Sequence, residues 1–152
     1  MENIVKPRVT NIEILNQTED RIPRKFVKEW VGQVYKNLKK QKILIKEKDL
    51  IVVFVSTSKM KNLNSQFRGK NKPTDILSFE PIEDGVLGEL VLCLPVLKKQ
   101  AKAHKLTLNE EIGYMLIHGI LHLLGYDHET NEREAKLMFD IQDKLFDKLL
   151  IK

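Results

Sequence analysis

The sequence predicts an α+β layer fold in a single domain, with a mixed sheet of about four strands packed with about five helices. Segments with strand-like and helix-like hydrophobic patterns are interspersed along the chain. The length of 152 residues is below that at which chains divide into separate cores, roughly 250 residues. A hydrophobic fraction of 42% is enough for a real core. We therefore treat residues 1–152 as one domain.

The first half of the chain alternates between strand and helix patterns. Residues 9–15 predict a short strand, and residues 23–40 predict a helix whose first turn tolerates a proline. The run DLIVVFVS at 49–56 is almost continuously apolar, which is typical of a strand covered on both faces. The serines and threonine after it can cap a further helix, with an apolar stripe formed by Met60, Leu63 and Phe67.

Two more strands and a helix follow a basic loop. Residues 74–79 and 87–94 predict strands, because both runs are apolar and a turn with proline and glycine separates them. A helix is expected from Pro95 to about His104. The order of the strands in the sheet is not predicted.

The C-terminal part is helical. Thr107 and Glu110 have the spacing of a capping box, which opens the most apolar helix of the chain. That helix is expected to run to about Leu124 and to stop at Gly125. The last helix is expected over 131–150, with a stripe of Leu137 or Met138, Ile141, Leu145 and Leu149.

The charge balance is mildly basic and identifies no partner by itself. There are 26 Lys and Arg against 21 Asp and Glu, for a net charge of +5. A lysine-rich run at 36–48 is interpreted as a solvated face or a secondary RNA contact. A shorter basic loop, 68–72, is judged below by its neighbours.

The cysteine content and the apolar runs favour a cytoplasmic protein. Cys93 is the single cysteine, so an intramolecular disulfide and a thiolate zinc site are excluded, and we expect it to be a buried small residue. The first ten residues lack the apolar segment of a secretory signal. No run of about 18 apolar residues is present, so we expect no membrane span.

Three histidines carry the strongest functional pattern. His118 and His122 are four residues apart on the predicted helix, so they project from one face, and Gly125 can let the chain turn back to bring His128 beside them. Three imidazoles about 2.0–2.1 Å from one ion, with a fourth position open, are typical of a catalytic zinc site. The alternative is that the histidines are hydrogen-bonded and inert. Gly119 inside the helix favours a close approach of another backbone.

The histidine spacing is also that of the metzincin proteases, whose signature begins His-Glu. Gly119 occupies the position of that glutamate in this sequence. Glycine cannot accept a proton, so the peptidase mechanism lacks its general base. Peptide hydrolysis is therefore the alternative and not the main hypothesis.

The segment HGILHLLGYDH at 118–128 resembles the signature of the YbeY family of bacterial metal-dependent endoribonucleases. Residues 64–79 resemble a second block of that family, N-x3-R…T-D-V-L-S-F, and residues 88–93 resemble a third, usually G-D-I-x-I. Glu89 replaces the usual aspartate and keeps the carboxylate, and Ile76 replaces valine.

This resemblance implies an α+β fold and cleavage of single-stranded RNA. It implies one zinc-type ion per chain, with Ni2+ or another divalent ion as alternatives, held by His118, His122 and His128. It further implies a role in maturation of the 3′ end of small-subunit ribosomal RNA and in ribosome quality control, with ribosomal RNA and the ribosome as partners. The oligomeric state is not predicted, and a monomer is assumed.

The resemblance also carries over Arg68 as the functional arginine. Arg68, Lys70 and Lys72 border one short loop, where cations could hold a phosphodiester and stabilise its developing charge. Thr74 and Asp75 are candidate supports of the substrate site, and the alternative is that they only set a turn.

The general base is left open. Asp127 could accept a proton or orient an imidazole, and Glu89 and Asp75 are weaker candidates. His104 is expected to be a surface or hydrogen-bonding residue, and no aromatic array for stacking bases is evident. Two alternative functions remain, a metal hydrolase of another class and a non-catalytic ribosome-assembly factor.

Overall fold

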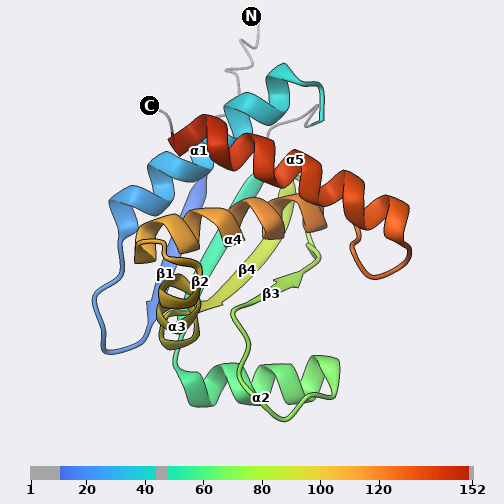
Figure 1. Cartoon of the computed structure of the whole chain (residues 1–152). Helices are drawn as coiled ribbons and strands as arrows, with labels where there is room; N and C mark the ends of the chain where they lie inside the picture. Colours follow the sequence, from blue (N-terminus) through green and yellow to red (C-terminus); the bar gives the residue numbers. More distant parts are fainter. Residues whose placement is uncertain (1–10, 44–47, 151–152) are drawn as a thin grey trace, which may run out of the picture.

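The computed structural model describes residues 11–43 and 48–150. Residues 9–10 of the first expected strand and residues 44–47 of the lysine-rich run lie outside them. The elements in chain order are β1 (Ile12–Gln17), α1 (Arg24–Lys40), β2 (Asp49–Val55), α2 (Thr57–Arg68), β3 (Ile76–Phe79), β4 (Val86–Cys93), α3 (Leu94–His104), α4 (Leu108–Leu123) and α5 (Glu132–Leu150) (Figure 1). None of the helices in these ranges is long and apolar enough to cross a membrane.

The strands form a mixed sheet. Among the described residues the sheet has four strands in the order β1-β2-β4-β3. Strands β1, β2 and β4 are parallel, whereas β3 pairs with β4 in the antiparallel direction. The expected α+β fold, with about four strands and five helices, is confirmed over this part of the chain. Strand β3 is an edge strand, so one of its sides is open to ligands.

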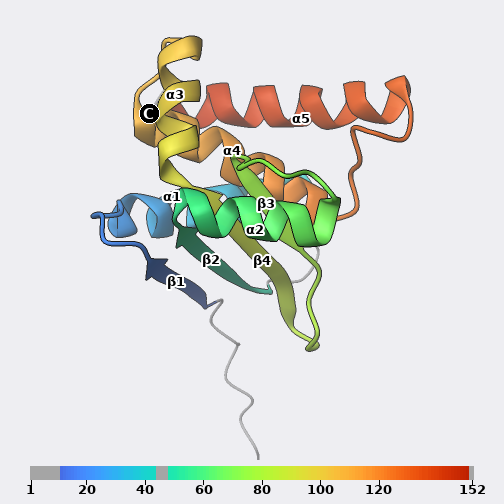
Figure 2. The ribbon, with the colours of Figure 1, turned by 90° about the horizontal axis from the view of Figure 1, so that it is seen from below.

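Both faces of the central strands are covered. Along β2, Leu50, Val52 and Phe54 join a core formed with residues of α1, α4 and α5, while Val53 and Val55 pack in a smaller cluster with Met60 of α2. This alternation is the strand period of two, and it confirms the expectation of a doubly covered strand. Figure 2 shows α4 and α5 stacked on one side of the sheet.

Helix α4 lies directly against the sheet because of a glycine. A Cβ atom at Gly119 would lie 2.7 Å from Leu90 Cδ2 and 2.9 Å from Ile76 Cδ1, both closer than packed carbon atoms allow. Gly119 is therefore a site of close packing against the sheet, but the nearest atoms are side-chain methyl groups and not the backbone that the sequence predicts. The expected capping box at the start of the helix is also present, through Thr107 and Glu110.

Two sequence expectations were wrong in detail, and the structure decides between two alternatives for a third. Phe67 was expected in the apolar stripe of α2, yet it is 57% exposed, because the last turn of the helix extends to the open edge of the sheet. Met138, and not Leu137, belongs to the buried stripe of α5. The strand expected from residue 74 begins at Ile76, whose backbone N–H donates to the side chain of Asp75 at 2.7 Å, as in a turn.

Candidate active site

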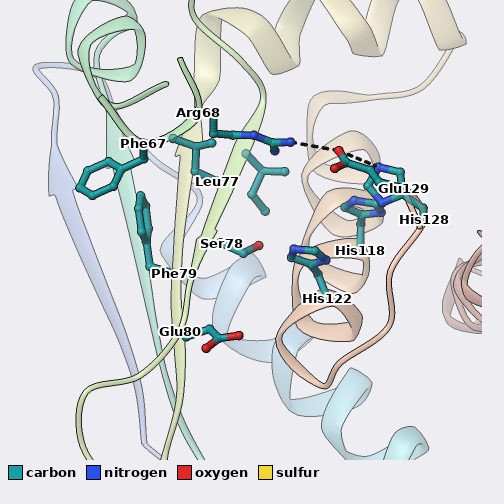
Figure 3. Close-up of a pocket in the computed structure, with 11 residues that line it drawn as sticks. Phe67, Arg68, Leu77, Ser78, Phe79, Glu80, His118, His122, His128 and Glu129 are labelled. Atoms are coloured by element: carbon teal, nitrogen blue, oxygen red, sulfur yellow. Dashed lines mark hydrogen bonds and ion pairs between the residues drawn. The ribbon is translucent and has the colours of Figure 1, made fainter. Parts of the chain in front are cut away.

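A pocket of about 360 Å³ lies beside the edge strand β3. It is bounded by the end of α2, by β3, by the last two turns of α4 and by the turn that follows α4 (Figure 3). Its polar lining is formed by Arg68, Ser78, Glu80, His118, His122, His128 and Glu129. The three expected metal ligands and the expected functional arginine therefore meet in one cavity.

The three histidine rings are close together, but they do not surround a common point at which a metal ion could bind. The ring centroids of His118 and His128 are 5.0 Å apart, and those of His122 and His128 are 6.4 Å apart. Imidazoles arranged tetrahedrally about 2.0–2.1 Å from one ion have centroids about 5 Å apart. Within residues 11–43 and 48–150, no three His, Cys, Asp or Glu side chains are close enough together to hold a metal ion as they stand. Binding would require His122 and His128 to move toward each other.

The hydrogen bonds behind the rings leave nitrogen atoms free for a ligand. His118 Nδ1 lies 3.0 Å from Gln142 Oε1, and His122 Nδ1 lies 3.1 Å from the backbone oxygen of Tyr126. An oxygen acceptor at Nδ1 fixes the proton there and leaves the Nε2 lone pair available, which is the usual arrangement behind metal-binding histidines. His128 Nδ1 is buried and has no hydrogen-bond partner in the described structure, so a ligand at this atom would satisfy it. The chemistry of these nitrogen donors suits a divalent ion, and the remaining mismatch is the separation of the His122 and His128 rings.

Burial also affects the charge of the site. It lowers the pKa of His118 below the ordinary value, while the hydrogen bond to Gln142 opposes this shift. A lower pKa favours the neutral imidazole, which is the form that binds metal ions.

The turn after α4 brings His128 back to the helix as expected. Gly125 has φ of +103°, and its N–H donates to the oxygen of His122 at 3.0 Å. The next N–H, of Tyr126, donates to the oxygen of Leu121 at 3.1 Å. Glycine adopts this left-handed conformation without a steric penalty, and such hydrogen bonds are typical of a helix C-terminus.

Asp127 stabilises the turn, and it is not part of the pocket lining. Its Oδ1 accepts the backbone N–H of Glu129 at 2.8 Å, and this hydrogen bond lowers the pKa of the Asp127 carboxyl. A lowered pKa makes the carboxylate a weaker base. The geometry therefore favours the orienting role for Asp127 over proton transfer.

Arg68 reaches into the pocket from the last residue of α2. Its Nη2 lies 3.0 Å from Glu129 Oε1, so the guanidinium connects α2 with the turn that carries His128 (Figure 3). The buried Asn64 donates through Nδ2 to the backbone oxygen of Lys72 at 2.8 Å and holds the basic loop against the helix. Lys70 and Lys72 are exposed in that loop and do not line the pocket.

Thr74 and Asp75 bond to structural partners. Thr74 Oγ1 donates to Asp75 Oδ1 at 3.2 Å, and Gln100 Nε2 donates to Asp75 Oδ2 at 3.1 Å. Neither residue lines the pocket, and their hydrogen bonds support the interpretation that they form the turn before β3. Glu89 lines two neighbouring hollows and not this pocket. His104 bonds to Glu111 away from the pocket, as expected of a hydrogen-bonding residue.

Sequence reasoning missed several residues of the site. Gln142 interrupts the apolar stripe of α5 and is buried, and a polar residue at a stripe position was the available signal. Glu129 follows the third histidine directly, but its contact with Arg68 depends on the fold. Sequence patterns also did not predict the contact between Phe67 and Phe79, whose ring centroids lie 5.0 Å apart and whose side chains line the pocket.

The chain is similar to known proteins over nearly all its length. The family model described as Endoribonuclease YbeY matches residues 13–150. A protein named Endoribonuclease YbeY from Bdellovibrio bacteriovorus is 51% identical over 142 residues, covering 91% of this chain and 95% of the relative. A protein of the same name from Sulfurihydrogenibium sp. is 43% identical over 133 residues, covering 84% of each chain. The solution structure of TM1509 from Thermotoga maritima matches with a TM-score of 0.64 at 34% identity, covering 90% of this chain and 87% of that one.

Proposed function

Because the chain belongs to the endoribonuclease YbeY family, we propose that it is an endoribonuclease that acts in ribosomal RNA processing and cleaves RNA at the pocket beside β3. The observation that carries this proposal is the meeting of three histidines with Arg68 in one cavity. A cation and a set of imidazoles at one open edge are the groups that phosphodiester cleavage needs.

We expect His118, His122 and His128 to hold one divalent ion, with zinc as the first candidate and Ni2+ as the second. When bound, the ion would supply a Lewis acid for the phosphodiester or lower the pKa of a water molecule. The acceptors at Nδ1 of His118 and His122 and the unpartnered Nδ1 of His128 support this assignment.

The proposed role of Arg68 is to bind the phosphodiester and to stabilise its developing negative charge. In this structure Glu129 accepts a hydrogen bond from the Arg68 guanidinium. A substrate phosphate could take the place of the Glu129 carboxylate, so that the guanidinium would still be paired with an anion. Lys70 and Lys72 are exposed beside it and would attract the polyanionic substrate without fixing its position.

Other residues position these groups. We propose that Asp127 orients the turn that carries His128, with proton transfer by Asp127 as the alternative. Thr74 and Asp75 would support the substrate site indirectly, by fixing the start of β3 next to the pocket.

The proposed context is the cytoplasm, where the protein would act as a single-domain monomer on ribosomal RNA or the ribosome. Membership of the family supports maturation of the 3′ end of small-subunit RNA and ribosome quality control as its processes. Peptide hydrolysis is disfavoured, because position 119 packs against Leu90 and Ile76 and has no room for the side chain of a general base.

Cleavage of defined substrates tests the proposal. Metal-loaded protein is incubated with single-stranded RNA, duplex RNA and casein, beside the variant Arg68→Ala and the control Arg133→Ala, an exposed arginine outside the pocket. We expect cleavage of single-stranded RNA alone, a fall of at least about a hundredfold for Arg68→Ala with unchanged metal content, and no change for the control.

Normal RNA cleavage by Arg68→Ala would contradict the assigned role. Cleavage of casein would favour a hydrolase of another class. Ribosome binding without any RNA cleavage by the wild-type protein would favour a non-catalytic assembly factor.

A further inference from the structure

An exposed aromatic pair lies next to the candidate active site. The rings of Phe67 and Phe79 meet edge to face, with centroids 5.0 Å apart and planes at 77°. Phe67 is 57% exposed, which is unusual for a large apolar side chain held in a fixed contact. Both rings line the same pocket as Arg68 and the histidines.

The two sides of strand β3 separate the aromatic pair from the histidines. Side chains alternate along a strand, so Ile76 and Ser78 face α4, whereas Leu77 and Phe79 face α2. Figure 3 shows Phe67 and Phe79 on one side of this strand and His118 and His122 on the other. Because β3 is the edge of the sheet, a chain-like ligand can cross it and touch both sides.

Phe67 and Arg68 are consecutive residues at the end of α2. Successive side chains on a helix diverge by about 100°. Arg68 therefore extends toward Glu129 and the histidines, while Phe67 packs on Phe79. A cation and an exposed aromatic surface are thus held one residue apart.

We propose that the Phe67–Phe79 pair is the stacking surface for one unpaired nucleobase next to the phosphodiester bound by Arg68. This inference rests on the proposed function. A nucleotide carries an anionic phosphate joined to a flat aromatic base, and the pocket offers a matching cation and aromatic surface at neighbouring positions. Bases within a duplex are already stacked, so this contact selects single-stranded RNA.

The occupant is a nucleobase and not an apolar protein side chain, because the aromatic pair is continuous with the cationic part of the pocket. Every base has a π face, so such a platform binds without strong sequence preference. Phe67 provides most of the open surface, whereas Phe79 supports it from the strand.

The test compares Phe67→Ala with Leu137→Ala, a leucine of α5 that is 53% exposed and outside the pocket lining. Binding of full-length protein to single-stranded RNA is followed by fluorescence anisotropy in the presence of a chelator, and cleavage is measured separately with metal-loaded protein. Each RNA is also made with a single abasic site at successive positions.

We expect Phe67→Ala to weaken binding of intact single-stranded RNA by at least about fivefold, and Leu137→Ala to leave it unchanged. At one position, removal of the base should weaken binding to the wild type but not to Phe67→Ala. Phe67→Trp should restore binding, because it restores an aromatic face, and binding of duplex RNA should not change. The melting temperature of Phe67→Ala should stay close to that of the wild type.

Equal binding by Phe67→Ala and Leu137→Ala would overturn the inference, as would an equal loss on intact and abasic RNA at every position. Absence of RNA binding by the wild type would overturn it as well. If metal-loaded wild type cut no RNA while the base-dependent loss persisted, the cleavage proposal would fail and the stacking surface would stand. If the wild type cut RNA and Phe67→Ala behaved normally, only the stacking surface would fail.

Discussion

A histidine forms a hydrogen bond at each end of helix α4, and the two ends differ in the group that is bonded to the histidine. Near its start, Glu111 is fully buried and its Oε1 lies 2.6 Å from Nδ1 of His104. Near its end, His118 and His122 have neutral oxygen partners at Nδ1 and line an open pocket. A histidine that pairs with a buried carboxylate serves the fold, whereas histidines held by neutral acceptors at a cavity keep a nitrogen free for a ligand.

The largest expected difference between the two ends concerns activity. His122→Ala should lower RNA cleavage by at least about a hundredfold and abolish metal binding, because it removes one of the three proposed metal ligands. When both proteins are compared without metal, the free energy of unfolding should change by less than about 0.5 kcal/mol, because the His122 side chain is exposed. His104→Ala, assayed under conditions where it is folded, should keep both activity and metal. Similar losses of RNA cleavage and metal binding in the two variants would contradict the different roles assigned to the two ends of α4.

Gln142→Met tests whether the hydrogen bond to His118 positions this ring at the C-terminal end of α4. The change removes the acceptor at His118 Nδ1 but keeps a buried side chain of similar size. We expect metal affinity to fall by about 10–100-fold in a competition titration with a chromophoric chelator. Gln100→Met, which removes a glutamine bonded to Asp75, is the control and should bind metal normally. Unchanged affinity in Gln142→Met would show that this hydrogen bond does not position the ring.

His104→Ala tests the structural role of the His104–Glu111 pair at the N-terminal end of α4. It leaves the buried carboxylate of Glu111 without its hydrogen bond, and we expect a loss of about 2 kcal/mol in the free energy of unfolding, measured in urea. The double variant His104→Ala/Glu111→Leu should recover much of this stability, because the buried charge is then removed too. A single variant as stable as the wild type would contradict a structural role for the pair.

The smallest expected effect concerns the distance between α4 and the sheet. Gly119→Ala should destabilise the protein by about 1 kcal/mol net, because the clash with Leu90 and Ile76 exceeds the gain in helix propensity. Gly32→Ala in α1 is the matched control, since nothing lies within 4 Å of its Cβ position. It should stabilise the protein by up to about 1 kcal/mol. Thermal unfolding of both variants measures the difference, and stabilisation by Gly119→Ala would contradict the close contact.

The local features of the fold and site were predictable from the sequence. The i, i+4 spacing of His118 and His122, the glycine turn before His128 and the close approach at Gly119 all follow from helix geometry and steric size. These features depend on residues close to one another in the chain.

The features that join distant segments were not predictable in the same way. The contact of Arg68 with Glu129 and that of Phe67 with Phe79 arise only when α2 packs at the open edge of β3. Strand order likewise depends on packing between elements. Gln142 acquires its role from the position of α5 over α4, although its polar character within an apolar stripe marked it as unusual.

Metal content measured together with RNA cleavage tests the central claim most directly. The purified protein is subjected to elemental analysis, and cleavage of single-stranded RNA is followed before chelation, after chelation and after addition of Zn2+. We predict about one divalent ion per chain, loss of cleavage on chelation and recovery on addition of the ion. Cleavage that continues at the same rate after complete removal of the metal would contradict the claim.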